Sequence, residues 1–287
     1  MSILLYGLPA LLYALAWRLA WPRALEGAAL PRAGGSVLPQ RWIVLAALLI
    51  QGVSLVLPVA ASEPHFGFAH VLSAAIWLAV GILWLESLAV QLGALWLLVL
   101  PVAIAVAWLP GVFPGARLAP PDAPLFVPHL LLGVCAYSFM TLAALQSILM
   151  AMAERALLAP ARLGSVAAGG SAGAPWGAWV EALPPLLALE RLLFRLINAG
   201  FIFLSLTVLT GIFFSESAFG RPFRLDHKTV FTLLAWSLFA TLLIGRRLHG
   251  WRGRTALRFT LGGFTLLMFA YAGSRFVFEV ILSRGPT

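Results

Sequence analysis

Two histidines in this chain stand at the start of long apolar segments, where a side chain can bind a metal. His227 follows the cationic stretch RPFRLD and precedes the apolar run KTVFTLLAWSLFATLLIG, and His129 opens another apolar run in the same way. An ionisable side chain at the mouth of an apolar helix is costly to place and is commonly functional. The partial positive charge of a helix N-terminus disfavours imidazolium, so each ring keeps the lone pair that binds a metal. We therefore take His129 and His227 as candidate ligands of a metal ion or of a haem iron.

The residues around His227 carry charge that would suit such a site. Arg221, Arg224 and Lys228 place positive charge near the start of the segment, and Asp226 precedes the histidine directly. The cations could pair with the propionates of a haem, or they could simply fix the depth of the helix end in a membrane. The Asp226 carboxylate can cap the helix or orient the His227 ring by accepting a hydrogen bond from it.

The other three histidines differ in their surroundings. His70 also starts an apolar run and is a third candidate ligand, His65 lies in the short loop before it, and His249 lies among arginines. Neighbouring cations disfavour metal binding at His249. A histidine at a helix start can equally anchor the helix at a membrane interface or bond to a loop carbonyl, so both interpretations stay open for His65, His70, His129 and His227.

The composition identifies the kind of element that must position these residues. The chain has 287 residues, of which 62% are hydrophobic and 10% charged, with a mean hydropathy of +0.98. A soluble domain needs far more charge to cover its surface, so the composition indicates a polytopic membrane protein. The net charge of +9 comes mostly from arginines beside apolar runs, as membrane topology requires, and we expect no binding to nucleic acid. The single cysteine, Cys135, excludes a disulfide within the chain and a covalently attached c-type haem.

Apolar runs of about 20 residues, enough to cross about 30 Å of hydrocarbon, recur along the chain. We expect spans near 3–20, 42–60, 68–86, 92–110, 128–152, 192–214, 228–246 and 258–282. The predicted fold class is all-α, a bundle of about eight transmembrane helices that forms one integral membrane domain over residues 1–287. The first run lacks the basic start and cleavage site of a signal peptide, so we expect it to remain as an anchor. The small residues of SVAAGGSAGAP predict a flexible loop over 156–188.

Arginine placement orients these spans. Most of the 19 lysines and arginines fall in the loops that follow the odd-numbered spans, or at the helix ends beside them. By the positive-inside rule those loops, including 156–188, lie in the cytoplasm and both termini lie on the outer, periplasmic side. The third, fifth and seventh spans then bring His70, His129 and His227 to a similar depth near the outer surface. Facing histidines from two helices are a common way to hold a haem iron inside a bundle.

Small and apolar residues continue the helix faces below two of these histidines. His129, Gly133 and Ala136 share one stripe, which predicts room for a flat ring against that helix. Phe231 and Leu234 continue the face below His227 and predict an apolar wall.

Two tracts resemble the cytochrome c assembly family of CcsA/CcmC-type membrane proteins. The tract LDHKTVFTLLAWSLFATLL is similar to the segment that follows the family's tryptophan-rich outer loop, with Asp226, Lys228 and Trp236 at matching positions and His227 at a proline position. The tract PHLLLGVCAYSFMTLAALQSIL resembles an earlier helix that opens with a haem-ligating histidine, with His129 and Tyr137 at the matching positions. The resemblance covers roughly the last 160 residues of the chain.

Two departures limit what the resemblance implies. The loop SESAFGRPFRLD contains no tryptophan, and the last span has Arg275 and Glu279 where larger synthases place a second outer histidine. The pattern is most similar to the divergent YpjD/HemX-like branch, which implies eight spans and a link to haem without synthase activity. On this resemblance we expect an accessory, non-enzymatic, haem-binding protein of the bacterial inner membrane. His129 and His227 would ligate a b-type haem, resident or transient, and the lipid bilayer and other cytochrome c assembly proteins would be its partners.

Two other functions stay open from the residues alone. A transporter or channel for a small solute would need polar residues deep in the membrane, and Gln51, Gln146 and Asn198 are the few candidates. A haem-free regulatory or scaffolding protein would act through its cytoplasmic loops, above all through the arginine-rich segment RRLHGWRGR.

Overall fold

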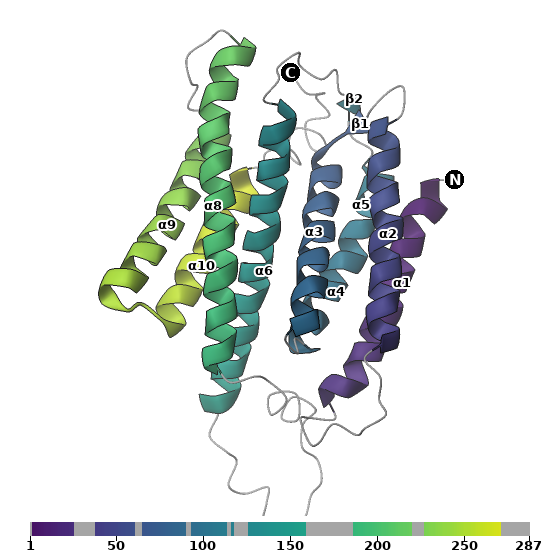
Figure 1. Ribbon diagram of the computed structural model, residues 1–287, viewed down its shortest axis with the longest axis horizontal. Coiled ribbons are helices and arrows are strands. Elements are labelled where there is room, and N and C mark those ends of the chain that lie inside the picture. Colours follow the sequence, from purple (N-terminus) through teal and green to yellow (C-terminus); the bar gives the residue numbers. More distant parts are fainter. Residues whose placement is uncertain are drawn as a thin grey trace, which may run out of the picture.

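The computed structural model describes residues 2–25, 38–60, 65–89, 93–113, 116–117, 126–158, 186–219 and 227–270, which are almost entirely helical (Figure 1). The elements in chain order are α1 (Ser2–Leu25), α2 (Leu38–Ala60), β1 (His65–Phe66), α3 (Phe68–Ala89), α4 (Gly93–Ala107), α5 (Leu109–Val112), β2 (Ala116–Arg117), α6 (Phe126–Leu158), α8 (Leu186–Phe219), α9 (His227–His249) and α10 (Gly253–Met268). The predicted helical fold is confirmed for these residues.

Six of the described helices are long and apolar enough to cross a membrane. They are the helical segments Pro39–Leu57, Phe68–Leu88, Leu95–Val112, Pro128–Arg155, Leu186–Ile212 and Lys228–His249. The apolar part of α1, Leu4–Ala20, is shorter, and α10 is described over 16 residues. The membrane-spanning character is therefore shown, while the count of eight spans and the side on which the termini lie remain predictions.

Several predicted boundaries were wrong because charged residues do not end these helices. The loop predicted over 156–188 overlaps helix at both ends, since α6 continues to Leu158 and α8 already begins at Leu186. α10 likewise begins at Gly253, five residues before the predicted span. In α6, α8 and α10 the arginines lie on the exposed face while apolar neighbours are buried. The helix therefore continues beyond its most apolar stretch.

His65 was expected in a loop, and the structure places it in a strand. β1 pairs with β2 in an antiparallel register that sets His65 opposite Arg117 and Phe66 opposite Ala116. This two-residue ladder lies against α2 and α3, at the end of the bundle where α3 begins (Figure 1).

The eight longer helices described form two four-helix units. In the N-terminal unit, α1 and α3 each contact both α2 and α4; in the C-terminal unit, α8 and α10 each contact both α6 and α9. α6 joins the units because it also contacts α3 and α4. Of the α6 span, 61% is buried inside the protein, the highest share among the six spans.

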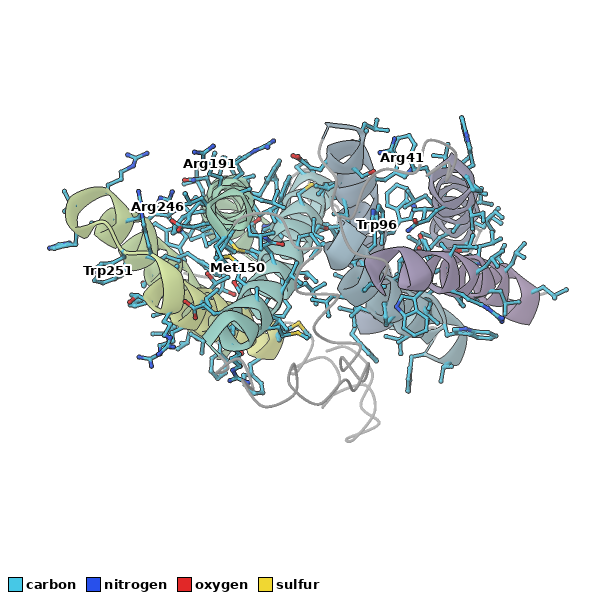
Figure 2. All side chains as sticks on the ribbon, turned by 90° about the horizontal axis from the view of Figure 1, so that it is seen from below. Arg41, Trp96, Met150, Arg191, Arg246 and Trp251 are labelled. Carbon is cyan, nitrogen blue, oxygen red and sulfur yellow. The ribbon has the colours of Figure 1, made fainter. Side chains whose placement is uncertain are left out.

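The two ends of the bundle differ in chemistry. The first turns of α3, α6 and α9 lie at the end drawn uppermost in Figure 1, which we call the histidine end. The turn between α9 and α10 and the first turn of α8 lie at the opposite end, which we call the arginine end. Figure 2, which looks onto that end, shows Arg191 and Arg246 on the C-terminal unit and Arg41 on the N-terminal unit.

Ion pairs tie the helices of the C-terminal unit together at the arginine end. Glu190 Oε1 lies 3.3 Å from Arg246 Nη1 and 3.6 Å from Arg252 Nε, so one carboxylate serves α8, α9 and the turn before α10. The Arg246 guanidinium also lies over the Phe194 ring, 3.3 Å from its centre. These contacts fix where α9 ends and therefore how its other end, with His227, is presented.

Candidate functional site

His129 is the best described of the candidate ligands. It lies in the first turns of α6, is half-buried, and its Nδ1 is 3.0 Å from Oγ1 of Thr210 on α8. The backbone of Thr207 interacts with the same ring. The imidazole therefore packs against α8 at the histidine end.

A glycine on α8 allows this close approach. A Cβ at Gly211 would lie 3.2 Å from Cε1 of His129 and 3.8 Å from its Nδ1. The first of these distances is tighter than most real Cβ contacts, so a larger residue at position 211 would push the ring slightly away from α8. The sequence reasoning missed both Thr210 and Gly211. Their hydroxyl-and-glycine pattern is common in membrane helices, and no single-sequence signal shows which helix faces His129.

The stripe below His129 is covered by α8. A Cβ added to Gly133 would meet the Thr207 methyl group at 3.8 Å, an ordinary contact, and Ala136 is buried. The room expected along this face is thus taken up by a neighbouring helix over the lower turns. Any flat ligand on His129 must lie at the histidine end itself, above Gly133.

His227 is the first residue of α9, at the same end of the bundle as His129 (Figure 1). Asp226, Arg221 and Arg224 lie outside the described residues. Lys228 is half-buried, and its carbonyl accepts a 2.8 Å hydrogen bond from the Thr232 hydroxyl. The structure therefore describes one side chain of this predicted cluster.

The two residues expected to form an apolar wall below His227, Phe231 and Leu234, face different surroundings. The Phe231 ring packs against Phe269, just beyond α10, with ring centres 6.1 Å apart. Leu234 is about half exposed on the surface of the bundle. Phe231 thus belongs to the interface between α9 and the end of α10, whereas Leu234 faces the membrane.

His70 is enclosed in the N-terminal unit. Its side chain is 2% exposed in the first turn of α3, close to Phe68, whose ring packs 5.4 Å from that of Phe113. α3 contacts α6, but His70 and His129 lie in different units. The structure thus describes two separate histidine environments at this end, one sealed and one half-open.

The two other positions that match the family pattern bind helices together. Trp236 Nε1 donates to the Ser205 hydroxyl at 2.9 Å and its ring stacks on Phe201, which connects α9 to α8. The Tyr137 hydroxyl donates to the Leu267 carbonyl at 2.5 Å, which connects α6 to α10. Both side chains therefore help to fix the helices that carry His129 and His227.

The deep polar residues considered for a transport path are used in packing or in local hydrogen bonds. Gln51 accepts a hydrogen bond from Tyr13 and donates to Ser73, and Gln146 donates to the Leu189 carbonyl. Asn198 is exposed and donates to the carbonyl one turn earlier on its own helix. An apolar groove of about 270 Å³ lies between α2 and α3, beside Leu48, Trp77 and Gly81, and offers no charged side chain.

The donor set that the structure describes fits haem better than a metal cluster. Within the described residues, no three His, Cys, Asp or Glu side chains gather closely enough to hold a metal ion. A haem needs one or two axial ligands from the protein, and the half-buried imidazole of His129 can supply one. Its Nδ1 is engaged by Thr210, which is the usual arrangement of a histidine that binds a metal through Nε2.

Comparison with known proteins agrees with the predicted family. The family model described as Cytochrome C assembly protein matches residues 41–282. The Inner membrane protein YpjD of Escherichia coli (strain K12) is 36% identical over 104 residues, which are 36% of this chain and 39% of YpjD. An uncharacterized 28.8 kDa protein of Azospirillum brasilense is 30% identical over 156 residues, 54% of this chain and 52% of that protein.

A similar relation holds to a protein named for cytochrome c biogenesis. The Cytochrome c biogenesis protein CcsA of Heterosigma akashiwo (strain NIES-293 / 8280G21-1) is 31% identical over 100 residues, 35% of this chain and 31% of CcsA. The chain thus spans about a third to a half of the length of these relatives. No solved structure matches. The apolar helices and the likeness to YpjD identify a multi-pass inner-membrane protein. Since the family model covers most of its length, the chain belongs to the cytochrome c assembly protein family.

Proposed function

We propose that this chain handles haem in cytochrome c biogenesis, and that it holds a b-type haem at the histidine end of its C-terminal unit. One observation carries the proposal: the His129 imidazole is held half-buried on α8, and α8 also contacts α9, the helix that begins with His227. Family membership supports the chemistry, because relatives in that family are named for cytochrome c biogenesis.

In this proposal His129 and His227 would hold the haem iron. The propionates would pair with Lys228, Arg221 and Arg224, and Asp226 would orient His227. Bound haem supplies an iron that can change its oxidation state, while the chain holds and orients the group. His70, sealed in the N-terminal unit, is a further candidate ligand. The protein acts as an accessory factor, since the loop before His227 lacks the tryptophans of the family's haem-presenting loop.

The same proposal places the histidine end outside the cytoplasm. Arginines gather at the opposite end, where Arg191, Arg247 and Arg258 are all exposed. The positive-inside rule then sets the arginine end in the cytoplasm, and α1 begins on the periplasmic side. With eight spans, both termini share that side.

Absorbance spectra test the proposal directly. The full chain, purified in mild detergent and supplied with haem, should show a b-type Soret band and a reduced α band. His129→Ala and His227→Ala should each lose most of the low-spin signal, because one axial ligand is removed. His249→Ala is the matched control, since His249 is exposed at the arginine end of the same helix as His227.

Two results would contradict the proposal. A wild-type protein that stays colourless after haem addition would exclude haem binding at these histidines. Equal spectra in wild type, His129→Ala and His227→Ala would show that the haem is held elsewhere, and His70→Ala would then be the next variant to measure.

A further inference from the structure

We propose that Thr210 is the positioning residue of the haem site: its hydroxyl oxygen keeps Nδ1 of His129 protonated, so that Nε2 is the nitrogen that binds iron. The statement about the tautomer concerns the protein without haem. Its consequence for iron binding rests on the proposed function.

The hydroxyl groups of α8 show where the Thr210 proton goes. Ser205, Thr207 and Thr210 each donate to the carbonyl four residues earlier, at 2.8 Å in all three cases. This back-bonding is the usual state of a hydroxyl in an apolar helix, where the carbonyl is the nearest acceptor. A hydroxyl has one proton, so the Thr210 oxygen faces Nδ1 with a lone pair.

The 3.0 Å contact between Thr210 Oγ1 and Nδ1 then needs a proton on Nδ1. In a neutral imidazole that leaves Nε2 with the lone pair. The Thr210 oxygen therefore favours the tautomer that is protonated at Nδ1.

Gly211 also helps to fix the position of the His129 ring. Because a Cβ there would lie 3.2 Å from Cε1, the Nδ1–Cε1 edge of the imidazole packs directly on the α8 backbone. α8 thus holds one edge of the ring by hydrogen bonding and by close contact. The ring plane is fixed before any ligand arrives, which lowers the entropy that haem binding must overcome.

A hydrogen bond from the far nitrogen of a ligating histidine raises the basicity of the nitrogen that binds metal. A stronger donor stabilises ferric over ferrous iron, so Thr210 should hold the reduction potential of the bound haem down. Loss of such a partner commonly costs about 10- to 100-fold in metal affinity. A residue with a purely structural role in α8 would change neither the tautomer nor the potential.

The first test needs no haem. In protein labelled with ¹⁵N-histidine, the His129 resonances are assigned by their loss in His129→Gln, which is practical with five histidines in the chain. Wild type and Thr210→Ser should show the pattern of an imidazole protonated at Nδ1. Thr210→Val should lose it in favour of the Nε2-protonated form or a mixture. An Nε2-protonated ring in wild type would overturn the inference, whatever the haem results are.

The second test measures haem. Thr210→Val should bind haem at least about tenfold more weakly and should raise its reduction potential, and Thr210→Ser should restore both. Thr207→Val is the matched control, because its hydroxyl bonds to Phe203 one turn away and its backbone is kept. Gly211→Ala should weaken binding by displacing the ring. Thermal stability in detergent, measured for every variant, separates these effects from misfolding.

The outcomes separate the two proposals. Haem binding lost with His129→Ala but unchanged in affinity and potential by Thr210→Val would overturn the role of Thr210 and leave the proposed function standing. A colourless wild type with the Nδ1-protonated ring would overturn the haem proposal alone. Equal changes in Thr207→Val and Thr210→Val would show a general effect of hydroxyl loss in α8 and would also contradict the inference.

Discussion

The two four-helix units bury their helices to different extents and seal them in different ways. In the N-terminal unit a continuous chain of buried polar side chains crosses three helices: Tyr13 donates to Gln51 at 2.7 Å and Gln51 donates to Ser73 at 3.1 Å. Three indoles add cross-helix bonds to backbone carbonyls, namely those of Trp17, Trp77 and Trp84. Every member of the Tyr13–Gln51–Ser73 chain is at most 1% exposed. In lipid, such satisfied polar contacts hold helices in one register.

In the C-terminal unit the α8 and α9 spans are largely uncovered, whereas the α6 span is the most buried of the six. Of the α9 span 22% is buried inside the protein, and of the α8 span 33%, compared with 56% for α3. Its helices meet through single hydrogen bonds, close contacts at glycines such as Gly200 and Gly263, and ion pairs at the arginine end. The candidate ligands His129 and His227 both belong to this unit.

We infer that the sealed N-terminal unit and the more open C-terminal unit have different roles. Buried polar side chains of the N-terminal unit, such as Tyr13, Gln51 and Ser73, form hydrogen bonds between its helices. In the C-terminal unit, α8 and α9 keep one side exposed. In the proposed function, haem passes apolar surface to reach His129, and the uncovered faces of α8 and α9 provide such a surface.

The largest effect on this comparison should come from Gly263, where α10 meets α9. A Cβ there would lie 2.8 Å from ring atoms of Phe239, which is fully buried. We expect Gly263→Ala to lower the stability of the protein by about 1–3 kcal/mol through overpacking. Thermal unfolding in detergent measures the change.

Gly262→Ala is the control for that variant, because its Cβ would meet Leu238 at an ordinary 3.9 Å. It should be neutral, or stabilising by about 0.5–1 kcal/mol from helix propensity. If both variants behave alike, then glycine contacts do not hold the C-terminal unit together and the contrast between the units fails.

A smaller loss is expected in the N-terminal unit from Tyr13→Phe. The change leaves the buried Gln51 side-chain oxygen without its donor, at a cost of about 1–2 kcal/mol in a membrane protein. Ser54→Ala is the control, since that hydroxyl donates to the carbonyl of Gln51 within the same helix. The haem spectrum of Tyr13→Phe should equal that of wild type. A bleached spectrum would show that the sealed unit takes part in the site.

The smallest effect should come from the arginine end. Glu190→Gln removes the carboxylate shared by Arg246 and Arg252 and should cost about 1 kcal/mol, less at high salt. Glu86→Gln is the control. It breaks the pair with Arg195 between α3 and α8, in which the arginine is 64% exposed, and should cost well under about 1 kcal/mol. A larger loss from Glu86→Gln would mean that charge, and not α6, couples the units.

The helices were predictable because the thickness of the hydrocarbon layer sets their length. The apolar composition of the chain, in turn, identifies them as membrane-spanning. Seven of the eight predicted spans fall on described helices, and the eighth, 258–282, does so as far as the end of α10, beyond which it leaves the described residues. Their ends were not predictable from hydropathy, since Arg191 and Arg254 lie on exposed helix faces and Arg254 pairs with Glu154. The predicted division of residues 68–110 into two spans, 68–86 and 92–110, was confirmed, as α3 ends at Ala89 and α4 begins at Gly93.

The candidate site was predictable as far as its histidines and the end of the bundle at which they lie. The helix that packs against His129 was not predictable, because the residues on a helix face indicate that the face is buried but not which helix buries it. We predicted space for a ligand along the helix face of His129 and Gly133, but Thr207 of α8 packs against Gly133 there. Thr210 and Gly211 acquire their role only through that packing.

The position of α6 also affects how the protein is made. The ring of α1, α2, α3 and α4 is complete in the chain before α6 is synthesised, so the sealed unit can close while later spans are still emerging. α6 then arrives with one side for α3 and α4 and another for α8 and α10. The first unit thus serves as an internal platform for the last three helices. A disruptive substitution in α6 should therefore leave α1 to α4 inserted and should prevent α8, α9 and α10 from packing.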